Sequence, residues 1–356
     1  MRTKNVIFVI VTSILVIGFI SPSVCVHFTS SRSTGTPKNT LFECNARISP
    51  QDAINAFVFI DGNAALDAYC AGNGTDGLTP ATAHVIRDLV LNASSIANGN
   101  GVVIHNTDRY LIICNCTVIG AHRSGQFTGI NIPGIGIWLW NSIHVNVTNC
   151  SLINNDGGLC LTDGCKNVVS ENLILNNGGG LSIRNSDENV VIGNKFSGNN
   201  GGIVLSSSRY NLISDNSIIN TSASIVDDDG AVALFEADSN SIINNNVSNN
   251  LGNGIYLFES RGNTIADNMV TGNAGACIKL VWFPWKWDHY FIVLNDIHGN
   301  VGCSDPQWSE PIASWSTIGI IAAAIACCAL VCRHLKRGTA PGTRPSLIRT
   351  PDQASC

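Results

Sequence analysis

Charged side chains are scarce in this sequence. Lys, Arg, Asp and Glu make up 13% of the 356 residues, and the formal net charge is -5. A chain so poor in positive charge gives no reason to expect nucleic acid as a partner. Methionine is scarcer still, with 2 residues, and there is no histidine-rich tract. The clusters of soft ligands expected of a copper-handling protein are therefore lacking.

Long apolar runs are confined to the two ends of the chain. Residues 6–20 follow the basic start MRTKN and precede the small residues Ser21 and Ser23, which is typical of a signal peptide. An uncleaved anchor is the alternative, although the run is short for a membrane span. Residues 312–332 are long enough to span, and the basic RHLKR directly after them predicts that the body faces outward.

These runs predict a single-pass protein of the cell membrane with its body on the extracellular side. We expect a signal peptide at 1–23, a linker and N-terminal segment at 24–56 and an ectodomain at 57–303. A juxtamembrane linker at 304–311, a transmembrane helix at 312–332 and a short cytoplasmic tail at 333–356 follow. The tail is too short to fold by itself.

The cysteines agree with an external location, because an oxidising compartment allows disulfides. Proximity along the chain suggests pairing of Cys160 with Cys165 and of Cys277 with Cys303. Sequons for N-glycosylation point the same way, although an asparagine-rich sequence also generates them by chance. They lie at Asn73, Asn92, Asn115, Asn146, Asn149, Asn220 and Asn246.

Asparagine recurs at fixed spacing through the second half of the ectodomain. One column of asparagines, about 22 residues apart, comprises Asn172, Asn194, Asn216, Asn245, Asn268 and Asn295, with further columns five residues before and after it. Two positions after each central asparagine stands an apolar residue, such as Ile174 or Phe196, and the residue between them varies. That alternation predicts short strands with one side chain inward and the next outward.

A repeat of this length, built from three short strands, is too short for a propeller blade and lacks the leucine signature of a horseshoe. It predicts an all-β fold, a right-handed parallel β-helix with coils of roughly 22 residues. Asparagine suits the corners because it tolerates left-handed backbone angles and its amide can bond to the same amide one coil away. The asparagine columns are therefore expected to be structural. Glycines at 157, 179, 201 and 230 mark another corner.

In two earlier coils, Cys116 and Cys150 stand at the position that the asparagine column has in later coils.

Three insertions interrupt the repeat at residues 121–134, 222–229 and 281–289. We expect them to project as loops, and loops on a rigid scaffold are where function concentrates.

The repeats NLISDNSIIN and NTIADNMVTGN resemble the parallel β-helix repeats of the NosD-like family within the pectin-lyase-like superfamily. The segment from VFIDGNAALDAYCAGNG to VIRDLVLN resembles the region that precedes the first coil in that family. The resemblance runs from about Phe57 to Asn300 and implies an archaeal type of membrane-anchored surface protein. Such repeats indicate the fold much better than the activity, because unrelated functions share it.

Three functional classes compete. The first is a non-catalytic surface module that binds carbohydrate or the cell envelope, since sugars stack on exposed aromatic rings. The loop with Trp282, Trp285, Trp287 and Asp288, together with outward-facing Trp138 and Tyr256, is the candidate site. A cap over the end of the β-helix or a contact with the bilayer is the alternative role for the tryptophan loop.

The second class is a polysaccharide lyase, hydrolase or epimerase, which needs clustered carboxylates with a base or a cation. Asp227, Asp228 and Asp229 could hold Ca²⁺, with Glu236 and Glu259 on neighbouring coils. A solvated acidic loop is the ordinary alternative. Arg184 and Arg209 could act as bases only beside such a cation.

The third class is copper-enzyme maturation, which the NosD resemblance implies. His105 with Cys114 and Cys116 is the sole candidate group, and a disulfide or a buried thiol is the expected state of the two cysteines. The sequence thus favours a non-catalytic, membrane-anchored β-helix with no catalytic residue, no resident metal and no cofactor, apart from the calcium option.

Overall fold

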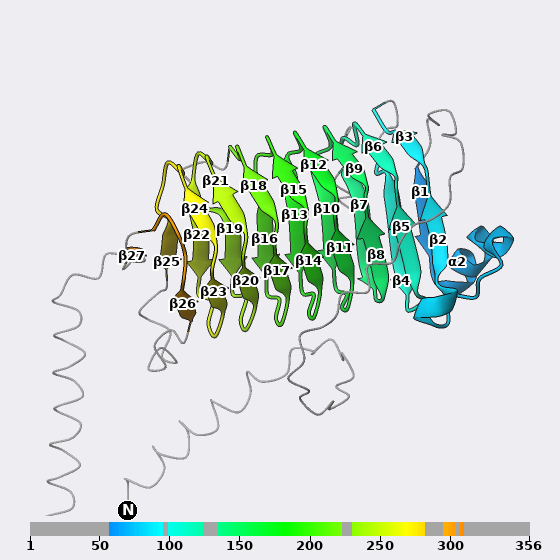
Figure 1. Cartoon of the computed structure of the whole chain (residues 1–356). Helices are drawn as coiled ribbons and strands as arrows, with labels where there is room; N and C mark the ends of the chain where they lie inside the picture. The colour runs from blue at the N-terminus through cyan, green and yellow to red at the C-terminus, as the bar shows by residue number, and fades with distance from the viewer. Residues whose placement is uncertain are drawn as a thin grey trace, which may run out of the picture. The chain divides into compact units, whose positions relative to one another are not determined.

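Short strands alternate with tight corners throughout the described chain, three strands to each coil. The computed structural model describes residues 57–94, 99–123, 134–222, 230–281, 295–303 and 307–309. Every strand pairs in parallel with the corresponding strand of the next coil, so three sheets run side by side along one axis (Figure 1). The parallel β-helix predicted from the repeats is confirmed.

The longest strands form the first sheet, which has ten strands and carries the groove described below. They are β1 (Val58–Asp61), β4 (Val102–Thr107), β7 (Ile135–Ser142), β10 (Gly157–Thr162), β13 (Gly179–Arg184), β16 (Ile203–Ser206), β19 (Gly230–Phe235), β22 (Asn253–Phe258), β25 (Ile278–Val281) and β27 (Gln307–Ser309).

The other two sheets consist of strands of three or four residues. The nine-stranded sheet contains β2 (His84–Arg87), β5 (Leu111–Cys114), β8 (Val145–Thr148), β11 (Val168–Ser170), β14 (Val190–Ile192), β17 (Leu212–Ser214), β20 (Ser241–Ile243), β23 (Thr264–Ala266) and β26 (Asp296–His298). The eight-stranded sheet contains β3 (Val90–Asn92), β6 (Thr117–Ile119), β9 (Ser151–Ile153), β12 (Leu173–Leu175), β15 (Lys195–Ser197), β18 (Ser217–Ile219), β21 (Asn246–Ser248) and β24 (Met269–Thr271).

The core follows the predicted alternation. In the eight-stranded sheet the middle residue of each strand points inward, and Ile174, Phe196 and Ile218 stack in register with no exposed surface. Burying one such side chain contributes about 1.5–3 kcal/mol to folding. Corner residues take left-handed angles, as at Asn176 (φ 53°) and Asn220 (φ 54°), a conformation that asparagine tolerates better than most residues.

The asparagine columns are buried ladders, as predicted. Asn194 Nδ2 donates to Asn216 Oδ1 (2.9 Å), and Asn216 Nδ2 donates to Asn245 Oδ1 (3.0 Å). Each Nδ2 also donates to a backbone carbonyl of the preceding coil, for example from Asn194 to Val169 O (2.9 Å). The ladder therefore satisfies corner peptide groups that would otherwise lie unbonded in the interior.

The position predicted for Asn295 is wrong by one corner. Asn268 Nδ2 donates to Asn300 Oδ1 (2.9 Å), so Asn300 continues the central column. Asn295 instead accepts from Asn263 (3.2 Å) in the neighbouring column. The coil that contains the third insertion is 32 residues long, and the 27-residue step from Asn268 to Asn295 therefore ended at the wrong corner.

Thiols replace asparagine in the two earlier coils. Cys150 and Cys116 are buried, and their Sγ atoms lie 3.7 Å from Ile113 O and 4.0 Å from Ile86 O. Those carbonyls are equivalent to the ones that the asparagine amides bond. The thiol is a weaker donor than the amide, so these corners depend more on packing.

One of the two predicted disulfides is correct. Cys277 and Cys303 are bonded, with their Cα atoms 5.4 Å apart. Cys160 and Cys165 are not bonded to each other, and neither forms a disulfide. Cys160 faces outward from β10 while Cys165 lies buried beyond the corner at Asp163 and Gly164, so proximity in sequence does not bring the two sulfurs together.

A short helix covers the first coil. α2 (Asn63–Tyr69) buries Leu66 against the core, and η1 (Ala71–Asn73) and η2 (Pro80–Thr82) complete this cap. Asp67 joins the cap to the coils, because its carboxylate accepts from Arg109 through Nε and Nη2 (both 3.0 Å) and bonds His84 Nε2 (2.9 Å). His84 is buried, and its other ring nitrogen is hydrogen-bonded with Thr75 Oγ1 (2.9 Å).

No helix within the described ranges is long and apolar enough to cross a membrane. The predicted signal peptide and the predicted transmembrane helix at 312–332 lie outside those ranges. Most of each of the three insertions also lies outside the described ranges, at 124–133, 223–229 and 282–294.

Candidate functional site: a groove on the ten-stranded sheet

The outer face of the ten-stranded sheet brings equivalent residues of successive coils into columns. Trp138, Cys160, Ser182 and Val204 form one column, since each pairs with the next in register. Two residues further along the strands, a second column contains Trp140, Thr162, Arg184 and Ser206. Long strands make this face wide enough to hold a ligand across several coils.

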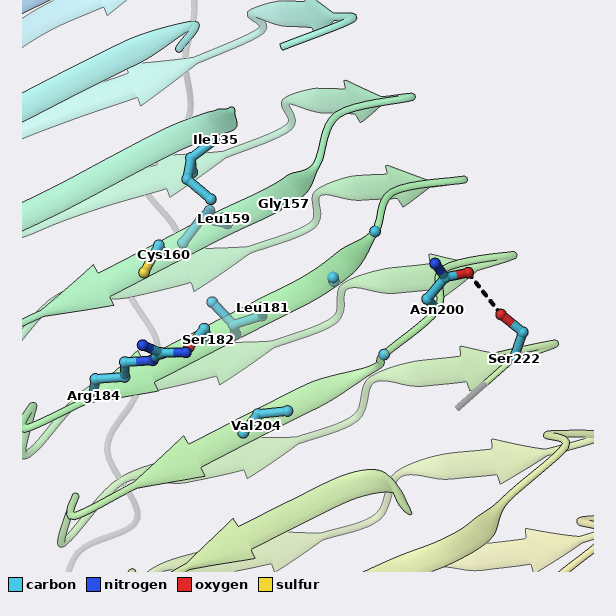
Figure 2. A pocket seen from close by; sticks show the side chains of 14 residues that line it. Ile135, Gly157, Leu159, Cys160, Leu181, Ser182, Arg184, Asn200, Val204 and Ser222 are labelled. Atoms are coloured by element: carbon cyan, nitrogen blue, oxygen red, sulfur yellow. Dashed lines mark hydrogen bonds between the residues drawn. The ribbon is translucent and has the colours of Figure 1, made fainter. Parts of the chain in front are cut away.

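A groove of about 620 Å³ lies on this face over β10, β13 and β16. Its floor is formed by Gly157, Gly179 and Gly201, which occupy the same outward position in three successive coils. The side chain of Ile135, one coil earlier, lies over Gly157 and ends the groove there (Figure 2). Because these three positions have no side chain, the main chain itself is the floor.

Polar groups line both long sides of the groove. Arg184 and Ser182 stand on the strand side, where Arg184 Nε donates to Ser182 Oγ (3.2 Å). On the corner side, Ser222 Oγ donates to Asn200 Oδ1 (2.7 Å) (Figure 2). Arg184 is exposed and is the only charged residue among the described residues that line the groove. The site therefore favours a polar or anionic ligand.

Cys160 also lines the groove, with its Sγ 3.4 Å from Thr162 Oγ1. Burial raises the pKa of the Cys160 thiol. A thiol with a raised pKa stays protonated at neutral pH and is a poor nucleophile. Cys160 is therefore a packing residue of the groove wall.

Aromatic rings continue the same face on β7, the strand that also carries Ile135. The rings of Trp138 and Trp140 stack with centroids 5.2 Å apart and planes inclined by 5°, and Trp138 Nε1 donates to Thr162 Oγ1 (3.1 Å). His105 stacks on Trp140 at 4.2 Å and lies 3.1 Å from Asp61 Oδ1. Both indoles are half-buried, and the stacking holds the two rings parallel to each other.

The other residues predicted for a sugar site are not part of this groove. Tyr256 faces outward as predicted, but only 3% of its surface is exposed and its ring packs against Phe235 at 5.7 Å. The expectation of an exposed ring at Tyr256 is therefore wrong, and the Phe235 ring of the preceding coil packs against it. Trp282, Trp285, Trp287 and Asp288 lie outside the described residues.

The predicted carboxylate cluster cannot be placed as a whole, because Asp227, Asp228 and Asp229 also lie outside the described residues. Glu236 and Glu259 occupy equivalent corners one coil apart, with φ of 49° and 48°. Arg209 is exposed in the turn between β16 and β17, one coil before Glu236, where its backbone N–H donates to Asp187 Oδ1.

The copper ligands suggested by the sequence are not assembled into one site. Cys114 is disulfide-bonded, Cys116 is fully buried, and His105 faces outward against Trp140 and Asp61. One ligand from the outer face and one from the interior cannot share a metal ion. The two cysteines have the states predicted for them. Across the described ranges, no group of three or more His, Cys, Asp or Glu side chains could hold a metal.

All seven predicted glycosylation asparagines lie outside the core, and each is exposed or half-buried. The exposed ones are Asn73, Asn115, Asn149 and Asn220, and the half-buried ones are Asn92, Asn146 and Asn246. Glycosylation at these positions stays a prediction.

Sequence reasoning missed the groove itself. It assigned the glycines at 157, 179 and 201 to a corner and overlooked Trp140, although a second tryptophan two residues after Trp138 predicts a ring on the same face. Three glycines in register, each followed two positions later by a core leucine or isoleucine, were the signal available for the groove.

Comparisons with known proteins support the fold. Residues 135–283 match the family model for a right-handed β-helix region. This part of the chain is therefore a right-handed parallel β-helix, as the repeats predicted. The NosD-like and archaeal assignments stay predictions. No curated protein sequence matches this chain significantly.

Several solved structures are distantly similar to this chain. The periplasmic alginate epimerase AlgG is 14% identical with a TM-score of 0.44, covering 66% of this chain and 64% of AlgG. Dettilon tailspike protein (gp208) is 17% identical with a TM-score of 0.48, covering 73% and 50%. The A-module of the mannuronan C-5 epimerase AlgE4 of Azotobacter vinelandii is 13% identical with a TM-score of 0.34, covering 73% and 89%. Similarity at this level carries no argument about this chain.

Proposed function

We propose that the outer face of the ten-stranded sheet binds a carbohydrate chain without turning it over. The observation that carries the proposal is the groove floored by glycine and continued by the rigid Trp138–Trp140 stack. Indole faces bind the C–H faces of sugar rings, and an open groove across several coils accepts a chain rather than a single small molecule. We propose further that the protein presents this face at the cell surface on the C-terminal span predicted at 312–332.

The polar groups favour a sugar chain that carries an acidic group. Arg184 is exposed at the groove edge and forms no ion pair within the described chain. Its guanidinium group can therefore bind a carboxylate or sulfate of the ligand with two parallel hydrogen bonds. Asn200 and Ser222 provide neutral donors and acceptors for hydroxyl groups on the opposite side.

The side chains that line the groove within the described chain support binding without turnover. Glycoside cleavage and epimerisation both require an acid and a base placed about the reacting carbon. The described lining residues include no Asp, Glu or His, and the single thiol among them has a raised pKa. Arg184 is a poor proton acceptor because arginine stays charged in proteins.

The test is a glycan array probed with the purified ectodomain, with and without calcium. We expect binding to a linear acidic glycan, weakened about tenfold or more in Trp138→Ala and Arg184→Gln, since each removes an interaction of roughly 1.5 kcal/mol. Tyr210→Ala and Arg209→Gln, which change exposed residues away from the groove, are the matched controls.

The products of the same incubation separate the alternatives. New unsaturated or reducing sugar ends would contradict binding without turnover and support an enzyme of the lyase, hydrolase or epimerase class. Equal binding by Trp138→Ala and the wild-type protein would place the site elsewhere on the chain. Stoichiometric copper binding without glycan binding would favour a role in copper-enzyme maturation.

A further inference from the structure

The outward position two residues before the core-facing leucine or isoleucine is glycine in three successive coils. Gly157 pairs with Gly179 in register, and Gly201 follows one coil later, since Leu181 pairs with Ile203. None of the three has a positive φ. Their backbone conformation is therefore open to any residue, and glycine in a strand lowers stability because it loses more conformational freedom on folding.

Packing explains some glycines of this corner but not all. A Cβ on Gly180 would collide with the carbonyl oxygen of Gly202, and a Cβ on Gly202 with that of Ala231. Those two glycines are needed for the close stacking of the coils. A Cβ on Gly179 or Gly201 would meet no atom of the described chain within 4 Å. Neither backbone strain nor packing requires glycine at these two positions.

We infer that Gly179 and Gly201 determine ligand specificity by leaving the groove floor free of side chains. The inference rests on the proposed function, because the ligand is the sugar chain that the groove binds. A sugar ring can then lie flat on the peptide planes between Arg184 and Asn200, which line opposite sides of the groove. A single Cβ, projecting by ~1.5 Å, would lift the ring away from both sides.

Steric selection follows from the same geometry. A linear chain presents a flat edge to the floor, whereas a branch on that edge would collide with the main chain. Ile135 lies over Gly157 and limits the groove at one end, so the chain must either stop there or turn along β7, which carries Ile135, toward Trp138. The ligand is therefore an unbranched segment in contact with at least two coils.

The first experiment measures stability and needs no ligand. Thermal unfolding of Gly179→Ala and Gly201→Ala should occur at the wild-type temperature or above it, because alanine restricts the unfolded chain and collides with nothing. Gly180→Ala is the matched control one residue away, and its unfolding temperature should fall. A fall for Gly179→Ala as large as that for Gly180→Ala would overturn the inference, since Gly179 would then be a structural residue.

The second experiment measures binding of the array-identified glycan to Gly179→Val and Gly201→Val. We expect both to bind about tenfold or more weakly than wild type, from the cost of overfilling a fitted site. Lys195→Ala, an exposed change on the eight-stranded sheet, should bind like wild type.

Failure of this inference and failure of the proposed function give different results. Wild-type affinity in both valine variants would overturn the role of the glycines while leaving carbohydrate binding intact. Absence of glycan binding by the wild-type protein would overturn the proposed function, and this inference with it.

Discussion

At the scale of single residues, the asparagine ladder means that substitutions at adjacent positions should differ in their effect on the free energy of unfolding. The Asn216 side chain is buried and bonds in both directions along the stack. Its Nδ2 donates to Asn245 Oδ1 (3.0 Å) and Val191 O (2.9 Å), while its Oδ1 accepts from the backbone N and the Nδ2 of Asn194 (both 2.9 Å). Ser217, the next residue, faces outward from β18.

We expect Asn216→Leu to destabilise the fold by at least about 1–3 kcal/mol, the cost of one buried hydrogen-bonding group left without a partner. Ser217→Leu should change the free energy of unfolding by no more than about 0.5 kcal/mol, as exposed substitutions usually do. Chemical denaturation of the two variants provides the comparison. Similar losses at both positions would contradict the ladder geometry.

At the scale of elements, the N-terminal cap depends on one carboxylate. Hydrogen bonds from Arg109 and then from His84 lower the pKa of Asp67 from its usual 3.8 to about 2. Because the folded-state pKa lies below that of the unfolded chain, the ionised carboxylate stabilises the cap above about pH 4. That contribution is lost as the pH falls from about 4 to about 2.

We therefore expect the cap to lose stability in acid as the Asp67 carboxylate is protonated. We expect Asp67→Asn to lower the unfolding temperature at pH 7 and to flatten the dependence of that temperature on pH between 2 and 4, the interval set by the pKa shift. Glu188→Gln, which removes a partly exposed ion pair with Lys166 (3.9 Å), is the control and should keep the wild-type slope. Parallel curves for Asp67→Asn and the wild-type protein would show that the cap does not depend on this carboxylate.

At the scale of the whole molecule, the proposed role requires that the ten-stranded sheet be displayed outside the cell. We expect the full chain to sediment with membranes and a chain ending at residue 311 to be released, because the apolar run 312–332 is the proposed anchor. Protease added to intact cells should remove the body and spare a tag on the tail. Protection of the body would reverse the proposed orientation, and release of the full chain would exclude this anchor.

The sequence by itself determined the repeating parts of the fold. Coil length, inward positions and asparagine columns follow from local rules: strand alternation has a period of two, and left-handed corners favour asparagine. Ile174 and Phe196 were placed correctly for that reason. The same rules failed at Asn295, where a coil of 32 residues shifted the register by one corner. Local periodicity cannot measure the length of an insertion that leaves and rejoins the stack.

The tertiary structure alone decided which residues share a surface. Trp138, Trp140 and Arg184 lie along one face because the coils of β7, β10 and β13 stack in register, and the groove beside Arg184 is open because Gly179 and Gly201 stand one above the other. Burial of Tyr256 and separation of Cys160 from Cys165 depend on neighbours contributed by other coils and corners. A groove is a property of side chains from several coils at once, so no single repeat contains the information that defines it.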